Sequence, residues 1–306
     1  RLGPRPNPRD DGRVQPAPVT VIVPTIGRAE LLERCVTSIL ACDPPPAEVV
    51  VVDQSHGPEI PALASRLGVR HVADAGRGIA RATNNGLRAA THDWVMRTDD
   101  DCTVAPDWVG VAVSRMAERP DGCVTGQVRA VGDEDGTPST ITDPDPRDLT
   151  GGTPGFYVYA GNMVVNRVRA LELGGFDERD GLRVAAEDND FSWRWMDAGL
   201  PLRYEPSMVV WHHDWRDDRS LRRRYRAYAR GQGALYAKHD VLGDRRVRVL
   251  LRADVRRGFR AVRAAVREPA RWRRADEERA LLLGIPVGYV SERLRALRSR
   301  PRRARG

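Results

Sequence analysis

The chain has 306 residues, enough to bury a large hydrophobic core as one domain or as one domain with an appendage. Its hydrophobic content of 41% is that of an ordinary globular protein, and no apolar run reaches the roughly 20 residues that cross a bilayer. The four cysteines, Cys35, Cys42, Cys102 and Cys123, form no CxxC pair and no zinc-type spacing with histidine. Free buried thiols in a reducing, cytoplasmic compartment are expected, with a disulfide role as the alternative.

The net charge of +8 is distributed unevenly along the chain. Residues 1–215 hold 22 Arg against 32 Asp and Glu, a charge of −10, whereas residues 216–306 hold 28 Arg and Lys against 10 acidic residues, a charge of +18. Such an asymmetry indicates separate roles for the two parts. The sequence therefore predicts a disordered, Pro- and Arg-rich lead-in over 1–17, a globular domain over 18–215 and a basic helical region over 216–306.

Strand and helix patterns alternate after the lead-in. The apolar, β-branched runs are typical of strands buried on both faces, and the segments between them have helical spacing. Their order and short connections predict an α/β fold, a doubly wound and mostly parallel sheet flanked by helices. The expected strands are 19–23, 48–53, 69–72 and 93–101, and the expected helices are 28–40, 60–67 and 80–90.

The patterns become less regular in the second half of the domain. A segment rich in Gly, Pro, Asp and Thr over 132–155 predicts a long loop, either a lid or disordered. Strand patterns follow at 156–165 and 203–211, and a helix is expected between them from Asp188 onward. Beyond His213 an Arg-rich helical pattern continues to the end of the chain.

Three adjacent carboxylates, Asp99, Asp100 and Asp101, end the strand predicted over 93–101. Their mutual repulsion requires a cation nearby, and hard divalent cations take oxygen ligands and bridge to substrate phosphates. Ligands of a doubly wound sheet bind beyond the carboxyl ends of its strands, where this triplet lies. A metal site is favoured over the alternative, a solvated acidic turn.

Candidate nucleotide contacts lie at the same edge of the sheet. Asp53 follows the second strand, where a carboxylate accepts hydrogen bonds from a base or ribose; an Asp that caps the next loop is an equal alternative. Gly76-Arg77-Gly78 begins like a dinucleotide-binding fingerprint, but Arg81 stands where its third glycine belongs. Arg77 and Arg81 at a helix N-terminus suit a diphosphate, with a glycine turn carrying surface arginines as the alternative.

Candidate acid–base groups come later in the chain. Glu187 and Asp188 open a helix that contains Trp193, and a carboxylate beside apolar rings has a raised pKa, as a base for an acceptor hydroxyl needs. Acidic residues that complement the helix dipole are an equal alternative. His212 and His213 follow another apolar strand; either imidazole suits a metal held by the aspartate triplet, and spacing does not distinguish the two.

Taken in order, these segments resemble the family 2 glycosyltransferases with a GT-A fold, over about residues 18–213. Each motif is weak alone, whereas the ordered set is specific. The motifs are VTVIVPTIGRAELLERCVTSIL, VVVVDQS, GRGIARATNNGLRAA, WVMRTDDDC, AGNMVVNRVRALELGGFDE, EDNDFSWRWMDAG and PSMVVWHH.

The resemblance implies a role for each candidate residue. Asp188 matches the catalytic base, and Asp101 matches the carboxylate that binds Mg²⁺ or Mn²⁺, with His212 near the metal. The residues on the nucleotide-sugar side are then Pro24, Thr25, Asp53, Arg77, Arg81, Asp99 and Asp100, and those on the acceptor side are Phe176, Asp177, Glu187 and Trp193.

The implied reaction is transfer of a sugar from a nucleotide sugar, with UDP or TDP favoured, to an acceptor hydroxyl with inversion. The Gln-x-x-Arg-Trp motif and membrane helices of processive synthases are missing, which implies single transfers. The acceptor is expected to be lipid-linked or a glycan. In the basic region 216–306, the segment RSLRRRYRAYARGQGALYAKH is expected to pack across the acceptor side, and the helices after it to rest on the inner face of a membrane. A solvated helix pair is an equal alternative.

Two other classes of protein fit less well. A nucleic-acid-binding protein is suggested by the pI of 9.8, but the acidic residues 1–215 would repel a phosphate backbone. A nucleotidyltransferase uses similar metal chemistry, yet it would carry a Gly-rich basic loop after the first strand, of which PTIGRAE is a thin version. A nucleic-acid partner is therefore not expected.

Overall fold

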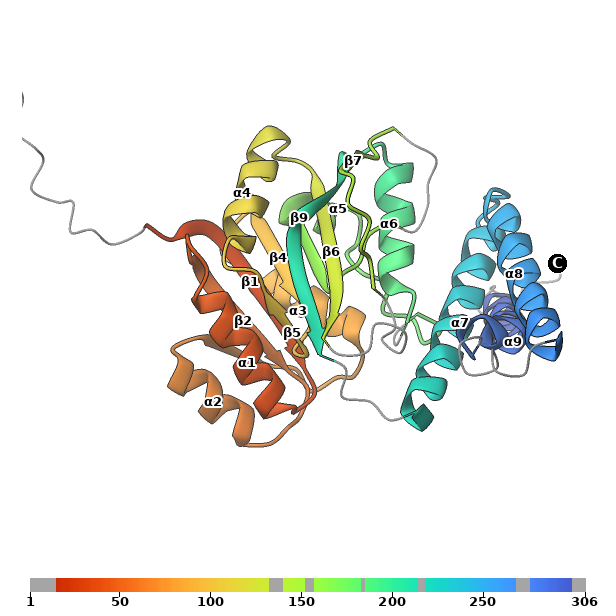
Figure 1. Cartoon of the computed structure of the whole chain (residues 1–306), viewed down its shortest axis with the longest axis horizontal. Coiled ribbons are helices and arrows are strands. Elements are labelled where there is room, and N and C mark those ends of the chain that lie inside the picture. Colours follow the sequence, from red (N-terminus) through yellow and green to blue (C-terminus); the bar gives the residue numbers. More distant parts are fainter. Residues whose placement is uncertain are drawn as a thin grey trace, which may run out of the picture.

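The computed structural model describes residues 15–131, 140–151, 157–182, 185–213, 218–267 and 276–298. These residues form a mixed sheet of nine strands flanked by helices, with three long helices beside it at the C-terminal end (Figure 1). Most of the predicted lead-in over 1–17, residues 132–139 and 152–155 of the predicted long loop, and residue 156 of the strand predicted over 156–165 lie outside the described residues. Among the described residues of that predicted strand, only those from Asn162 onward form a strand. None of the described helices is long and apolar enough to span a bilayer.

The first half of the sheet is parallel, as predicted. Strands β3, β2, β1 and β4 are neighbours in that order, and all their pairings are parallel. The elements are β1 (Ala17–Thr25), α1 (Ala29–Leu40), β2 (Pro46–Asp53), α2 (Glu59–Leu67), β3 (Arg70–Ala73), α3 (Ile79–Ala89) and β4 (Trp94–Thr98).

The second half of the sheet is mixed, which the sequence did not predict. Strand β8 joins β4 in antiparallel orientation, and only β6 and β9 form a parallel pair beyond it. Between β4 and β8 the chain passes through α4 and through the strands β5, β6 and β7, so β8 does not continue the regular alternation of strand and helix that gives parallel neighbours. The elements are β5 (Cys102–Val104), α4 (Trp108–Glu118), β6 (Cys123–Val131), β7 (Arg147–Asp148), β8 (Asn162–Asn166), α5 (Arg167–Glu172), α6 (Glu187–Asp197) and β9 (Leu202–His213).

Each face of the sheet buries its own hydrophobic core. Val21 of β1 points to a cluster that includes Leu32 of α1 and Trp108 of α4. The next residue, Ile22, points to the other face, where it joins a cluster that includes Leu87 of α3. Because successive side chains alternate between faces, a strand covered on both sides must be apolar throughout, which explains the continuous VTVIV run.

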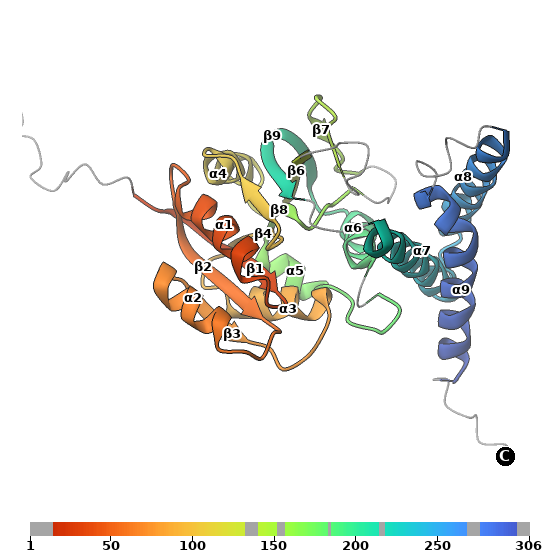
Figure 2. The ribbon, with the colours of Figure 1, turned by 60° about the horizontal axis from the view of Figure 1, so that its bottom comes forward.

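The basic C-terminal region forms α7 (Asp218–Val241), α8 (Val247–Arg267) and α9 (Asp276–Arg298). Figures 1 and 2 show α7 between α6 and the other two helices. Two glycines of α7 permit close contact on both sides. A Cβ at Gly231 would lie 2.4 Å from the carbonyl oxygen of Ala185, and a Cβ at Gly233 would lie 2.1 Å from that of Ile285 in α9. These contacts hold the backbone of α7 against both neighbours.

We predict that Gly233→Ala destabilises the protein, because the added methyl group cannot fit between α7 and α9. Overpacking of this kind typically lowers the free energy of unfolding by about 1–3 kcal/mol. Gly57→Ala is the matched control, since a Cβ at Gly57 would meet no atom within 4 Å. Denaturant unfolding of both variants tests the close contact between α7 and α9. Equal free energies of unfolding for the two variants would contradict this contact.

Candidate active site

A cavity of about 590 Å³ lies beyond the carboxyl ends of β1 and β4. Its wall also includes the first turn of α6, the end of β9, and parts of α7, α8 and α9. Many of the site residues predicted from the sequence meet in this one space. They are Pro24, Thr25, Asp99, Asp100, Asp101, Glu187, Asp188 and His212.

The middle aspartate of the triplet is engaged by the loop after β1. Asp100 is 1% exposed, and its Oδ2 accepts hydrogen bonds from Thr25 Oγ1 at 2.7 Å and from Arg28 Nε at 3.2 Å. Its Oδ1 forms an ion pair with the same guanidinium. Burial raises the pKa of Asp100 to about 6, although Arg28 opposes the shift. Asp100 thus fixes the β1–α1 loop against the end of β4.

The third aspartate faces His212. His212 Nε2 lies 3.6 Å from Asp101 Oδ1, and Arg28 Nη1 donates to Asp101 Oδ2 at 2.9 Å. The alternation of β9 directs the next residue elsewhere, so that His213 Nε2 lies 3.0 Å from Thr103 Oγ1. Of the two histidines that spacing left equivalent, only His212 faces the triplet.

The donor set at Asp101 and His212 fits a divalent cation completed by a substrate. No three His, Cys, Asp or Glu side chains converge as a metal cage anywhere in the described ranges. One carboxylate and one imidazole nevertheless suit Mg²⁺ or Mn²⁺, since Mg²⁺ is commonly held by one or two protein ligands with phosphates and water. His212 Nδ1 is buried and has no hydrogen-bond partner within those ranges. No hydrogen bond at Nδ1 therefore determines which of the two ring nitrogens carries the proton.

The first aspartate depends on a buried arginine. Arg97 of β4 is 2% exposed, and its Nη2 donates to Asp99 Oδ1 at 2.7 Å. Gly161 lies on the other side, where a Cβ would be 2.8 Å from Asp99 Oδ2. The charge of Arg97 also acts on Glu187 and Asp188, and it therefore links the triplet to the helix across the cavity. An arginine inside the apolar strand WVMRT was the overlooked signal.

Glu187 and Asp188 occupy the first turn of α6, where the helix dipole favours negative charge. Burial raises the pKa of both carboxyls, and repulsion by Asp188 adds to the shift at Glu187. The backbone N–H of Asn189 donates to Asp188 Oδ1 at 2.8 Å and opposes the shift. Asp188 remains partly exposed in the cavity, whereas Glu187 is 8% exposed. Asp188 is therefore the more accessible carboxyl of the pair, and its pKa is raised by burial, the direction that suits a general base.

Asp53 lies next to the cavity but does not line it. Its Oδ2 is 3.1 Å from His71 Nε2, and its Oδ1 accepts a hydrogen bond from the backbone N–H of Ser55 at 2.7 Å. Its neighbour Gln54 does line the cavity. Asp53 therefore orders the loop after β2, and its contact with a nucleobase stays a prediction.

The two arginines of the glycine turn have different surroundings. Arg81 Nε donates to Asp74 Oδ1 at 2.8 Å, and Gln54 Nε2 donates to Asp74 Oδ2 at 2.7 Å. Arg77 is exposed. Neither arginine lines the cavity, and their contact with a diphosphate stays a prediction. Asp74, which holds this corner together, was not identified from the sequence.

Two aromatic residues predicted on the acceptor side are buried at α6, outside the cavity. Phe176 is 1% exposed and stacks on Phe191 of α6, with ring centroids 4.5 Å apart. Trp193 is also 1% exposed, and its Nε1 donates to Asp244 at 3.0 Å, beyond the end of α7. Neither residue lines the cavity: Trp193 belongs to α6 itself, and Phe176 packs against that helix.

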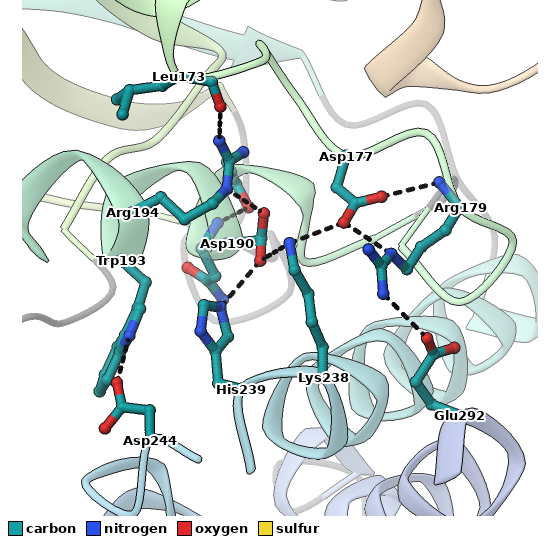
Figure 3. A network of polar contacts seen from close by, with 12 residues as sticks. Leu173, Asp177, Arg179, Asp190, Trp193, Arg194, Lys238, His239, Asp244 and Glu292 are labelled. Carbon is teal, nitrogen blue, oxygen red and sulfur yellow. Dashed lines mark hydrogen bonds and ion pairs between the residues drawn. The ribbon is translucent and has the colours of Figure 1, made fainter. Parts of the chain in front are cut away.

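A buried ionic network joins α6 to α7 (Figure 3). Asp190 is 0% exposed and contacts Lys238 Nζ at 2.6 Å, His239 Nε2 at 3.0 Å and Arg194 Nε at 2.8 Å. Lys238 also donates to Asp177 at 2.7 Å. Asp177, predicted on the acceptor side, is therefore part of this network. Lys238 is the only lysine in the sequence. The network fixes the helix of the candidate base to the C-terminal region.

The C-terminal helices contribute a wall whose individual residues were not identified from the sequence. Tyr225, Tyr228 and Gln232 of α7, with Asp254 and Arg257 of α8, line the cavity opposite the sheet. Asn189 of α6 donates to Gln232 Oε1 at 2.8 Å, whereas Gln232 Nε2 is buried without a partner in the part of the chain that is described. Aromatic rings and hydrogen-bonding groups of this kind suit a polar ligand such as a sugar. The interleaved Arg and Tyr of RSLRRRYRAY were the signal.

Comparison with known proteins agrees with this geometry. The sequence model described as glycosyl transferase family 2 matches residues 20–172. A pre-mycofactocin glycosyltransferase of Mycobacterium tuberculosis is 28% identical over 207 residues, which are 63% of this chain and 42% of that protein. Succinoglycan biosynthesis protein ExoO of Rhizobium meliloti is 37% identical over 107 residues, 34% of this chain and 30% of that protein. The chain spans less than half the length of these curated relatives.

Two solved structures have a similar fold. Mannosyltransferase PcManGT from Pyrobaculum calidifontis, in complex with GDP-Man and Mn²⁺, has a TM-score of 0.56 at 21% identity. The aligned region covers 94% of this chain and 76% of the mannosyltransferase chain. GalNAc-T7 with UDP, GalNAc and Mn²⁺ has a TM-score of 0.52 at 20% identity, over 70% of this chain and 47% of its own. At these identities the likeness shows the fold alone, the GT-A fold expected from the sequence.

We predict that Lys238→Met lowers the free energy of unfolding by roughly 3–5 kcal/mol, because it removes a cation from the buried carboxylate of Asp190. Arg66→Met is the matched control; it breaks an ion pair with Glu33 whose side chains are 60% and 43% exposed. Exposed pairs contribute about 1 kcal/mol or less. Equal losses in the two variants, measured by denaturant unfolding at pH 7, would contradict the role of the network.

The penalty of Lys238→Met should also depend on pH. A hydrogen bond with His239 and the charges of Arg194 and Lys238 hold the pKa of Asp190 below its usual range in spite of burial. A depressed carboxyl pKa stabilises the fold above the unfolded value of about 3.9, and this contribution is lost as the pH falls toward the folded value. The difference between wild type and variant should therefore shrink in acid.

Glu187→Gln should stabilise the protein at alkaline pH. A carboxyl whose folded pKa is raised contributes stability below its unfolded value of about 4.3, and that stability is lost as the pH rises through the folded value. Glutamine keeps the neutral form, so the variant should gain roughly 1 kcal/mol at pH 8 and little at pH 5. Glu59→Gln, at an exposed position, is the control. Parallel stability curves for wild type and Glu187→Gln would refute the raised pKa.

Proposed function

The chain belongs to the family 2 glycosyltransferases, and on this basis we propose that it transfers a sugar from a nucleoside-diphosphate sugar to an acceptor hydroxyl. One observation carries the proposal. A single cavity is lined by the aspartate triplet, by His212 and by the carboxyl pair at the start of α6. Charge-compensating groups for a leaving diphosphate and a base for an incoming hydroxyl thus border the same space.

We propose that the nucleotide lies along the ends of β1 and β2, against Pro24, Thr25 and Asp53, and that UDP or TDP is the preferred donor carrier. The diphosphate then points toward Asp99 and Asp101. Arg77 and Arg81 are proposed to approach it from the start of α3. Thr25 supports this arrangement, because its bond to Asp100 fixes the loop at 2.7 Å from the triplet.

The proposed reaction depends on Mg²⁺ or Mn²⁺ held by Asp101 and His212. When bound, such a cation neutralises negative charge that builds on the leaving diphosphate. Arg28, which contacts Asp100 and Asp101, adds a fixed positive charge beside the same position. The Mn²⁺ in both solved neighbours is consistent with this assignment.

Asp188 is the proposed general base. Its carboxylate accepts the proton of the acceptor hydroxyl while the oxygen attacks the anomeric carbon and the bond to the diphosphate breaks on the opposite side. A single displacement inverts the configuration, and no second nucleophilic carboxylate is required. Arg97 supports the ionised form of Asp188 by its charge, while burial works in the opposite direction. The net effect is a raised pKa, the direction that a general base requires.

Residues 18–215 are the proposed catalytic domain, and residues 216–306 complete its acceptor side. Glu187 borders the proposed acceptor site. The other acceptor-side residues, Phe176, Asp177 and Trp193, do not line the cavity and are proposed to support the site by holding α6 in place. The two tyrosines of α7 suit a glycan or the glycan part of a lipid-linked acceptor, because aromatic faces pack against sugar rings. We propose single transfers, since the sequence contains no Gln-x-x-Arg-Trp motif of processive synthases. We further propose that the reaction takes place on the cytoplasmic side of a membrane.

Thermal unfolding with UDP, TDP and GDP, each with and without Mn²⁺, tests the donor site. A nucleotide at about 100 times its dissociation constant adds roughly 2.7 kcal/mol of stability. We expect one nucleotide to raise the midpoint only with Mn²⁺, and Asp101→Ala to abolish the shift. Asp107→Ala, at an exposed position outside the cavity, should leave it intact.

Asp188→Asn separates binding from chemistry in the same assay. The variant should keep the nucleotide shift and lose release of nucleoside diphosphate from the donor sugar by roughly a hundredfold or more. Release of pyrophosphate instead would indicate nucleotidyl transfer. The proposal fails if no nucleotide shifts the midpoint, or if the shift survives Asp101→Ala.

A further inference from the structure

One face of α9 carries a continuous apolar stripe in solvent. Leu283, Val287, Val290, Leu294 and Leu297 follow one another at intervals of four and three residues, which places them on one side of a helix. They are 75%, 47%, 54%, 49% and 57% exposed in that order. These residues do not build the hydrophobic core of the protein.

The stripe points away from α7. Positions on the opposite side of α9 carry the contacts with that helix, since a Cβ at Gly284 would lie 2.4 Å from Ala229 Cβ and one at Gly288 would lie 1.9 Å from Arg230 O. Figure 2 shows α8 and α9 at the end of the molecule that is remote from the sheet. The stripe therefore lies far from the mixed sheet and its cores.

The exposed face of α8 combines apolar residues with arginines. Val249, Phe259 and Val266 are 67%, 62% and 66% exposed, and spacing places Arg252, Arg256 and Arg263 on the same face. These three arginines pair with no carboxylate in the described part of the chain. Every described side chain of α8 and α9 that is both charged and exposed is an arginine.

We propose that α8 and α9 form a membrane-docking surface, in which the apolar side chains enter the headgroup region of a bilayer and the arginines bind anionic phospholipids. Arginine suits this position because its aliphatic stem lies along apolar surface while its guanidinium reaches the phosphates. A second copy of the chain fits less well, because two arginine-rich faces would repel each other. Charge complementarity thus favours an anionic lipid surface.

This surface extends the proposed function, because it is the part of the protein that would contact the membrane. It does not depend on the catalytic role proposed for Asp188. An acceptor with a lipid anchor would remain in the bilayer while its polar end reaches the cavity, whose wall α7, α8 and α9 share. Docking and donor binding use different residues. They can therefore fail separately.

Co-sedimentation of the full chain with extruded vesicles tests the proposal. We expect binding to vesicles of equal parts phosphatidylcholine and phosphatidylglycerol, and little binding to phosphatidylcholine alone. Arg252→Gln/Arg256→Gln/Arg263→Gln should weaken binding on the order of a hundredfold, and the remaining binding should depend less on salt. Leu283→Ser/Leu294→Ser should weaken it at every salt concentration.

A matched control is Leu40→Ser/Val168→Ser, which removes apolar side chains that are 40% and 43% exposed on α1 and α5. This variant should bind like wild type. All variants should keep the wild-type unfolding midpoint and nucleotide shift, which separates failure of docking from failure of folding or of the transferase assignment. The proposal is overturned if wild type ignores anionic vesicles, or if the surface variants bind as it does. Light scattering that shows a dimer lost in Leu283→Ser/Leu294→Ser would assign the stripe to a second copy instead.

Discussion

The ion pair between Asp190 and Lys238 is the contact on which the geometry of the site depends (Figure 3). Asp190 lies on the same first turn of α6 as Asp188, so whatever fixes Asp190 also fixes the candidate base. Lys238 belongs to α7, whose backbone is held close to the segment before α6 by Gly231. The C-terminal region therefore does more than extend a finished domain, because it sets the position of a helix in the cavity wall.

Fixed positive charges compensate the crowded acids of the cavity. Arg28 contacts Asp100 and Asp101, and Arg97 contacts Asp99 and acts on the carboxyl pair across the space. Three adjacent carboxylates would otherwise be strained by repulsion. A diphosphate with a divalent cation adds little net charge to such an environment, so a site of this kind can receive it without rearranging its own ion pairs.

Local patterns predicted the fold up to β4 because each strand there has its own apolar run and each helix its own spacing. The triplet and the carboxyl pair were recognisable for the same reason, since their members are adjacent in sequence. The mixed half of the sheet, the bond of Lys238 to Asp190 and the individual residues of the tyrosine wall were not predictable in this way. Each depends on which surfaces meet across long stretches of chain, and periodicity reports only which face of an element is apolar.

Asp188 and Asp190 show why a sequence pattern could not assign roles within the acidic turn. They are two residues apart on one helix, yet burial raises the pKa of the first. A hydrogen bond with His239 and the charges of Arg194 and Lys238 lower the pKa of the second in spite of burial. A carboxylate surrounded by cations is a poor proton acceptor and a strong anchor, and one that lies among other carboxylates is the reverse. The helix needs both, because a base is useful only where an anchor holds it in place. The contacts that Lys238 and His239 of α7 make with Asp190, and not with Asp188, therefore distinguish the anchor from the candidate base.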